Sequence, residues 1–258
     1  MTNTTEAALN GTYNLFLVGL SILVAMLASY TALDLAGRIT AASGRARLVW
    51  LAGGSLVMGI GIWSTYFLGI LAFSIPLPMT YDLVTVLASM AVAIAASALA
   101  LFVVSRPSMG AAQLAGGGFL MAIGILGTHY VGMEGLRLQA SLSYDPVLVV
   151  LSGVVALVAA LAALWLAYQL RREPATQAKW LALKIGSALF LGAAISGMHY
   201  TGMAAATFRP SEKLADAPPQ SAQIDTSPLA VGVATTTFLI LGAAIFTAIL
   251  NRRFKDQE

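Results

Sequence analysis

The sequence predicts an all-α membrane protein with seven transmembrane helices, built from three similar helix pairs and one further helix. Of its 258 residues, 59% are hydrophobic and only 10% are charged, and the mean hydropathy is +0.84. Soluble domains carry about 25% charged residues, so a chain this poor in charge must present apolar surface to lipid. It has no cysteine, which excludes disulfides and thiolate metal sites. The net charge of +3 gives no indication of nucleic-acid binding.

Seven apolar runs have the length of about 20 residues that a helix needs to cross a bilayer. The runs do not alternate between apolar and polar residues, as the strands of a membrane barrel would. Residues 1–12 contain no Lys or Arg, so no secretory signal is recognised and the first run is expected to be a retained span. The predicted spans are Tyr13–Leu33, Leu48–Phe73, Leu83–Val104, Gln113–Leu136, Pro146–Leu170, Leu181–Thr207 and Pro228–Leu250.

Basic residues predict the orientation of these spans. Of the 14 Lys and Arg residues, all but Arg137, Arg209 and Lys213 fall on one side. The positive-inside rule places that richer side in the cytoplasm, with the N-terminus extracytoplasmic and the C-terminal tail, residues 251–258, cytoplasmic. The basic residues of the richer side are Arg38, Arg45, Arg47, Arg106, Arg171, Arg172, Lys179, Lys184, Arg252, Arg253 and Lys255.

An internal repeat links the second, fourth and sixth spans. The segments Trp63–Ile70, Leu126–Met133 and Ser196–Met203 align without gaps. The first two are followed by Tyr81-Asp82 and Tyr144-Asp145, which open the next span. The unit is therefore a helix pair of roughly 65 residues, repeated in parallel orientation. We place the repeats at residues 13–78, 79–141 and 142–209, with 228–250 as the seventh helix of a single domain over 1–258.

The chain has only two histidines, His129 and His199, and they occupy equivalent repeat positions. Each has a methionine four residues later, Met133 and Met203, on the same helical face, and Met198 adds a thioether on another face. Because the motif helices run in one direction, these side chains are expected to converge near the extracytoplasmic boundary. Imidazole and thioether without thiolate or carboxylate favour copper, especially Cu(I). The alternative is a structural role, with each histidine hydrogen-bonded across helices.

Other polar residues have simpler interpretations. We expect Tyr66, Tyr130 and Tyr200 to occupy one repeat position and favour an interfacial aromatic belt over hydrogen bonds to the histidines. Asp34 is expected to pair with Arg38 near the end of the first span.

The motifs Met198–Thr201 and Thr128–Val131, each followed by Gly-Met, resemble the MHYT family of bacterial membrane sensors. Residues 29–37 and 61–64 are also similar to that family, so the resemblance covers essentially the whole chain. It implies a seven-helix sensor of the bacterial inner membrane that binds copper through His and Met. It further implies a response to oxygen, carbon monoxide or nitric oxide, and a frequent link to cytoplasmic cyclic-di-GMP signalling domains.

The first copy departs from the family pattern. Thr65, Tyr66 and Ile70 stand where the family has Met, His and Met, so the second span is expected to wall the site and not to ligate a metal. The sequence ends eight residues after the seventh span, which we interpret as a sensor module that acts alone or through a cytoplasmic signalling partner.

The sequence thus predicts a membrane sensor that responds to a diatomic gas or to copper. A copper or proton transporter is the alternative, and the sensed ligand and the oligomeric state stay open. No enzyme activity is expected, because a copper-dependent oxidoreductase would need an electron-relay partner that the sequence does not show. The predicted metal ligands are His129, Met133, His199, Met203 and Met198.

Overall fold

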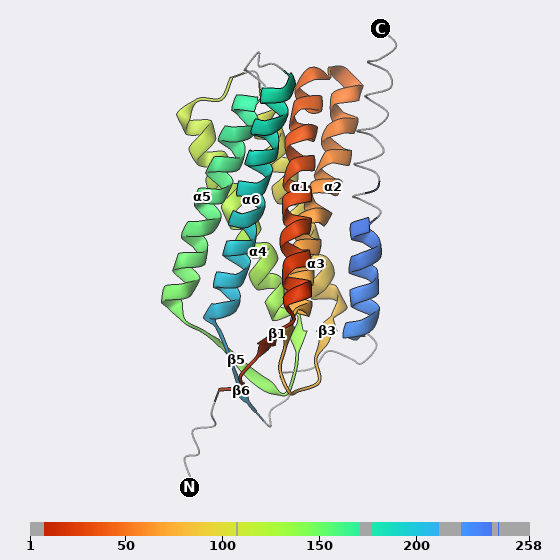
Figure 1. The fold of residues 1–258 in the computed structure, drawn as a ribbon, viewed down its shortest axis with the longest axis vertical. Coiled ribbons are helices and arrows are strands. Elements are labelled where there is room, and N and C mark those ends of the chain that lie inside the picture. The colour runs from red at the N-terminus through yellow and green to blue at the C-terminus, as the bar shows by residue number, and fades with distance from the viewer. Residues whose placement is uncertain (1–7, 107, 171–176, 212–222, 239–241, 243–258) are drawn as a thin grey trace.

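Six long helices form a closed ring in the computed structural model (Figure 1). The structure describes residues 8–106, 108–170, 177–211, 223–238 and 242. Each helix packs against its neighbours in the chain, and α6 packs against α1 to close the ring. The helices are α1 (Leu15–Ala41), α2 (Gly44–Leu71), α3 (Leu83–Val104), α4 (Ala111–Glu134), α5 (Pro146–Leu170) and α6 (Gln177–Ala205).

All six helices are long and apolar enough to cross a membrane, which confirms the predicted class of a multi-pass, mostly helical membrane protein. Large apolar side chains such as Leu15, Val49 and Val147 are exposed on the outside of the ring, as lipid contact requires. The third and fifth predicted spans coincide with α3 and α5. Residues 226–238 are helical and begin the predicted seventh span. The rest of that span, apart from residue 242, and the tail 251–258 lie outside the described residues.

Glycines let neighbouring helices approach closely. A Cβ at Gly192 in α6 would overlap the backbone of Met26 in α1, and one at Gly59 in α2 would overlap the backbone of Ile94 in α3. Small residues at such crossings are the usual means by which membrane helices pack, because lipid supplies no hydrophobic drive to hold them together. The glycines of the motif helices therefore determine how tightly the ring closes.

Short antiparallel ribbons cover one end of the ring, which we call the ribbon end. The sequence does not predict these ribbons, because strands of two to five residues carry too little alternation to be recognised. Each ribbon joins the start of one helix to the end of the next and so closes one helix pair. The pairs are β1 (Thr12–Tyr13) with β2 (Phe73–Ser74), β3 (Thr80–Asp82) with β4 (Leu136–Arg137), and β5 (Ala140–Tyr144) with β6 (Ala206–Pro210), while β7 (Gln223–Asp225) pairs with β3.

An Asn or Asp side chain caps the first helix of each pair. Asn14 accepts hydrogen bonds from the first turn of α1, Asp82 from the amide of Thr85 in α3, and Asp145 from the first turn of α5. The hydrogen bonds from Thr85 hold the pKa of Asp82 below its usual value. The Tyr-Asp pair that the sequence shows twice therefore has a third counterpart in Tyr13-Asn14.

At the opposite end, a partly buried ion pair joins α6 to α1. Lys184 is 1% exposed, and its Nζ donates a hydrogen bond of 2.5 Å to Asp34 Oδ1 while lying 4.0 Å from the centre of the Tyr30 ring. Asp34 also accepts from Arg38 Nε at 2.7 Å, as predicted. The Lys184 contact was not predicted, because nothing in sequence spacing shows that the first and sixth helices are neighbours. Helix α1 continues to Ala41, past its predicted end at Leu33, and so includes Asp34.

We expect Asp34→Asn to lower the melting temperature of the purified protein in detergent. It leaves the buried Lys184 ammonium without its counter-charge. Breaking a fully buried pair costs about 3 kcal/mol or more, and the cost here should be smaller because the Asp34 side chain is 31% exposed. The double variant Asp34→Asn with Lys184→Met should recover part of the loss, and Arg38→Gln should change the melting temperature less. An Asp34→Asn variant as stable as the parent protein would contradict a role for this pair in closing the ring.

Candidate metal centre

Three rings from three motif helices meet at the axis of the bundle, close to the ribbon end. His129 of α4 and His199 of α6 have ring centres 5.1 Å apart, and Tyr66 of α2 lies 5.4 Å from the first and 5.6 Å from the second. The three rings are nearly perpendicular to one another. All three side chains are buried, with His129 1% and His199 3% exposed. We call this set the imidazole layer; the structure therefore brings the two predicted histidines together.

Glycines shape the imidazole layer in a cyclic pattern. Each ring packs against the glycine that follows the motif on a neighbouring pair, at a point where a Cβ would overlap the ring. The same repeat position thus supplies the glycine in all three contacts, which gives the layer approximate threefold symmetry. The contacts are His129 on Gly202, His199 on Gly69, and Tyr66 on Gly132.

The polar atoms of this layer have no hydrogen-bond partner within the described part of the chain. Both ring nitrogens of His129 and of His199 are unpaired, and so is the hydroxyl of Tyr66. The backbone of Gly69 lies beside His199 but does not meet hydrogen-bond geometry. Leaving one buried polar group unpaired costs about 1–3 kcal/mol. Five such atoms in one place make the imidazole layer the candidate functional site of the described residues.

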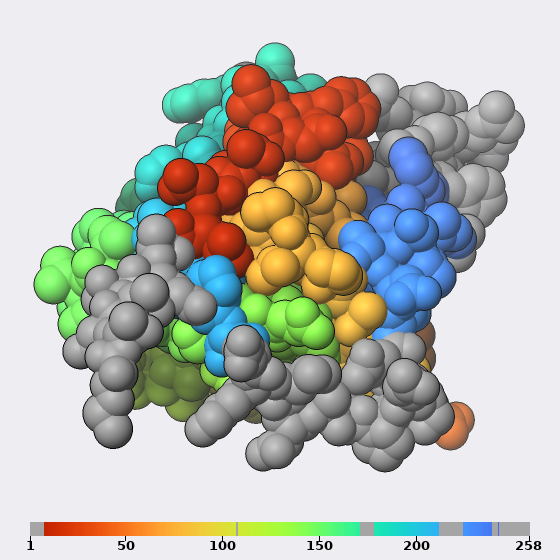
Figure 2. Space-filling view, turned by 90° about the horizontal axis from the view of Figure 1, so that it is seen from below, coloured from red at the N-terminus to blue at the C-terminus, as the bar shows by residue number. Residues whose placement is uncertain are grey.

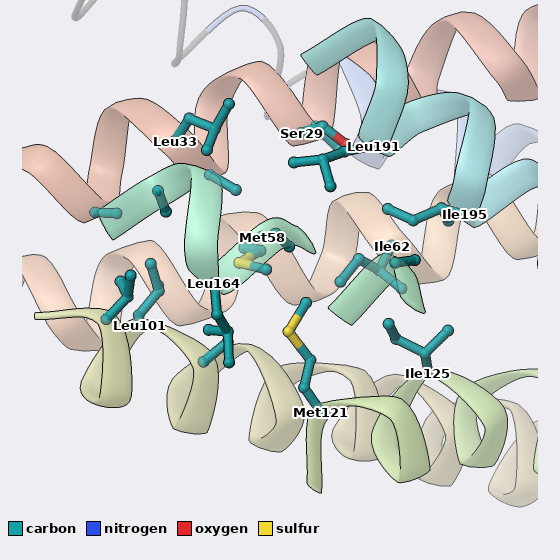
Figure 3. Close-up of a pocket in the computed structure, with 18 of the residues that line it drawn as sticks. Ser29, Leu33, Met58, Ile62, Leu101, Met121, Ile125, Leu164, Leu191 and Ile195 are labelled. Atoms are coloured by element: carbon teal, nitrogen blue, oxygen red, sulfur yellow. The ribbon is translucent and has the colours of Figure 1, made fainter. Parts of the chain in front are cut away.

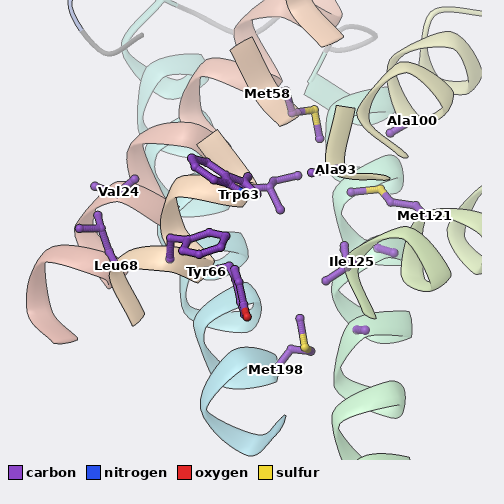
Figure 4. Close-up of a cluster of buried hydrophobic side chains, with 14 of the residues drawn as sticks. Val24, Met58, Trp63, Tyr66, Leu68, Ala93, Ala100, Met121, Ile125 and Met198 are labelled. Carbon is purple, nitrogen blue, oxygen red and sulfur yellow. The ribbon is translucent and has the colours of Figure 1, made fainter. Parts of the chain in front are cut away.

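Three methionines lie in the same core as these rings. Met133, Met198 and Met203 are all buried in the hydrophobic cluster that contains Tyr66, and the Tyr66 hydroxyl points toward Met198 (Figure 4). In the first repeat the corresponding side chains cannot coordinate copper well. Thr65 donates its hydroxyl hydrogen to the Gly61 carbonyl at 3.0 Å, and Ile70 has no donor atom. The described residues contain no group of three or more His, Asp or Glu side chains that would form a different kind of site.

The structure corrects the interpretation of the tyrosines. Tyr66 occupies the histidine position of the first repeat, whereas Tyr130 and Tyr200 stand one position later and do not bond to the histidines. Their hydroxyls pair instead with Ser152 at 2.9 Å and Ser21 at 2.8 Å. The belt interpretation is wrong for Tyr66, which is buried at the axis. The gap-free alignment contained the signal, because it sets Tyr66 opposite the histidines.

The ribbons place a second set of tyrosines over the motif helices. Tyr13 packs edge-on against Tyr200 at 5.9 Å, Tyr81 against Phe67 at 6.0 Å, and Tyr144 against Tyr130 at 5.5 Å. Burial raises the pKa of Tyr81 to about 12, and burial followed by the charge of Glu134 raises the pKa of Tyr144. These phenols stay neutral at physiological pH. Seen from the ribbon end, segments of all three helix pairs meet over the ends of the helices (Figure 2).

These features define a polytopic membrane protein of three tandem helix hairpins, with buried imidazole groups at the shared axis. Residues 59–117, 123–178 and 192–256, more than half of the chain, match the MHYT family, described as a bacterial signalling protein N-terminal repeat. The chain belongs to this family, which confirms the resemblance seen in its motifs.

Relatives of known description carry the same region in longer proteins. The chain is 44% identical to the bifunctional diguanylate cyclase/cyclic di-GMP phosphodiesterase MucR of Pseudomonas aeruginosa, over 94% of this chain and 35% of MucR. It is 34% identical to signaling protein YkoW of Bacillus subtilis, over 96% of this chain and 30% of YkoW. It is also 39% identical to the cyclic di-GMP phosphodiesterase NbdA of P. aeruginosa, over 76% of this chain and 25% of NbdA. The chain thus spans about a third or less of these relatives, and the catalytic domains of MucR and NbdA lie outside the matched region. No solved structure matches it.

We expect Gly202→Ala to disturb the imidazole layer and Gly197→Ala in the same helix to leave it intact. A Cβ at position 202 would overlap the ring of His129, whereas one at 197 meets its nearest neighbour, Val155, only at 4.0 Å. Alanine is better than glycine inside a helix by about 1 kcal/mol, so Gly197→Ala should hold or raise the melting temperature and Gly202→Ala should lower it. Nitrogen-15 spectra should show shifted His129 imidazole signals only for Gly202→Ala. Equal effects of the two variants would show that the glycine contact with the ring has no special importance.

Proposed function

We propose that this chain is a membrane sensor that binds copper at the imidazole layer and responds there to a diatomic gas or to copper itself. The observation that carries the proposal is the set of four buried, unpaired imidazole nitrogens on two rings 5.1 Å apart. Two imidazoles on one metal ion each need a bond of about 2 Å, and this ring separation is compatible with that. A histidine with a purely structural role would be expected to have a hydrogen-bond partner.

The donor set favours copper over other metals. His129 and His199 would supply nitrogen, and Met133, Met203 and Met198 would supply thioethers. Zinc more often takes Cys or carboxylate, and calcium and magnesium need oxygen ligands, which this part of the described chain does not provide. Copper(I) held there would offer reversible coordination of a small neutral ligand.

The protein around this position would keep it dry and leave one side open. Tyr66 fills the place of a third histidine with a neutral phenol, which ligates a soft metal poorly but can donate a hydrogen bond to a bound ligand. Phe67 and the ribbon tyrosines would exclude bulk water from the ribbon end. Because His129 and His199 belong to different helix pairs, a change in coordination at the imidazole layer would alter how those pairs pack against each other.

The arrangement of side chains favours a sensor over a copper or proton transporter. A transport path would need polar groups on both sides of the imidazole layer. On the side away from the ribbons the axis is lined mostly by hydrocarbon, starting with Ile62, Ile125 and Ile195, one helical turn from the layer. The thioethers of Met58 and Met121 are the only soft metal ligands in that lining, and it contains no charged or imidazole side chain, so it does not provide a continuous path for copper or protons.

We further propose that the end opposite the ribbons faces the cytoplasm and passes the response to a signalling partner there. Basic residues support this orientation: among those that the structure describes, only Arg137 and Arg209 lie at the ribbon end. The described basic residues at the opposite end are Arg38, Arg45, Arg47, Arg106, Lys179 and Lys184.

The relatives whose names include a cyclase or phosphodiesterase suggest a cyclic-di-GMP enzyme as the kind of partner.

We expect His129→Ala and His199→Ala each to remove most of the copper(I) affinity, by tenfold or more, because each takes away one of two imidazole ligands. Tyr66→Phe removes only the hydroxyl and should change the affinity by less than threefold. Titration against a competing Cu(I) chelator in detergent measures all three, with Tyr200→Phe as a control outside the layer. Full affinity in both histidine variants would end the copper proposal, and a large loss in Tyr66→Phe would show that the first repeat also contributes.

Orientation is tested by single cysteines in this cysteine-free chain. Ser43 and Ser141 are both exposed, the first between α1 and α2 and the second in β5 at the ribbon end. In intact spheroplasts, an impermeant thiol reagent should label Ser141→Cys and spare Ser43→Cys until the membrane is opened. The reverse pattern would overturn the proposed orientation without affecting the metal proposal.

A further inference from the structure

An apolar cavity lies within the ring of helices, on the side of the imidazole layer away from the ribbons (Figure 3). Side chains from all six helices line it. Its end nearest the layer is formed by Ile62, Ile125 and Ile195, each one helical turn before a residue of the imidazole layer. From there it extends toward Leu33 and Leu101 at the far end.

The lining repeats in each helix pair, so the cavity is a feature of the repeated fold and not of one irregular contact. Ala32, Ala100 and Ala163 all line it, and each stands at the same distance from the Asn or Asp that caps its helix. These alanines face the axis where a larger residue would fill the space. The leucines that follow them, Leu33, Leu101 and Leu164, also line it.

The cavity offers almost nothing to a polar guest. Its only lining hydroxyls belong to Ser29 and Thr65, and each donates to a carbonyl of its own helix, Ala25 at 2.8 Å and Gly61 at 3.0 Å. A buried water needs two to four polar partners, and a buried charge needs a counter-charge. Dry cavities lined by apolar side chains are instead able to take up small apolar molecules such as xenon.

We propose that this cavity is a binding site for a small, uncharged, apolar molecule that dissolves in the membrane. The guest would be held by dispersion contacts with the alanine, leucine and methionine side chains, one layer of isoleucines away from the imidazole layer. This site is separate from the proposed metal site, and its occupancy requires no metal.

The test uses xenon as the probe on metal-free full-length protein with carbon-13-labelled methionine methyl groups. Met58 and Met121 line the cavity, whereas Met133 and Met203 stand four residues after the histidines in their helices and do not line it. Rising xenon pressure should shift the methyl signals of Met58 and Met121 along a saturating curve. The signals of Met133 and Met203 should move less and without saturation.

Matched variants of α3 separate the cavity from the lipid-facing surface. Ala100→Leu fills the cavity and should abolish the saturable shift, whereas Ala95→Leu adds the same side chain on the exposed face and should leave it unchanged. Ala32→Leu and Ala163→Leu repeat the test at equivalent positions if Ala100→Leu fails to fold. Because the test is made on metal-free protein, failure of the copper proposal leaves this one standing.

Three results would overturn the proposal. The first is the absence of a saturable shift at Met58 and Met121, and the second is an equal shift in Ala100→Leu and the parent protein. The third is magnetisation transfer from detergent acyl chains to the Met58 and Met121 methyl groups that persists under xenon, because it would show that the cavity holds a lipid chain. None of these results bears on copper binding at the imidazole layer.

Discussion

The contact between a motif ring and the glycine of a neighbouring helix pair is the constraint on which the rest of this structure depends. At Gly69, Gly132 and Gly202 the absence of a side chain lets a ring from another pair reach the axis. Any larger residue would push that ring outward and separate the helices. The same contact therefore brings three helices together, buries two imidazoles, and gives the three pairs a common centre.

The surroundings of the imidazole layer differ on its two sides. Toward the ribbons, it meets a set of aromatic rings, and two of their hydroxyls pair with serines of the odd-numbered helices. Away from the ribbons, it meets a mostly apolar lining, in which the hydroxyls of Ser29 and Thr65 are paired with carbonyls of their own helices. Polar groups inside a membrane are expensive unless they are satisfied, and the unpaired nitrogens of His129 and His199 are therefore the observation on which the metal proposal rests.

At the end of the ring opposite the ribbons, a charged contact holds the helices together, whereas at the axis they are held by close packing against glycines. Lys184 is enclosed by Asp34 and two aromatic rings, and this group ties the last helix of the third pair to the first helix of the first pair. A ring of repeats has one junction that no chain connection supports, and here that junction carries a partly buried ion pair.

The sequence by itself determined the helical membrane class, the spans and the repeat, because apolar length and self-similarity are local properties of a chain. It also singled out His129 and His199, since two matched histidines in a chain without others are visible before folding. Only the tertiary structure decided that Tyr66 shares their layer, that Lys184 reaches Asp34, and that alanines of three helices leave a cavity on the axis. Each of these joins residues from different helix pairs. Their proximity depends on the closure of the ring, which no spacing along the sequence encodes.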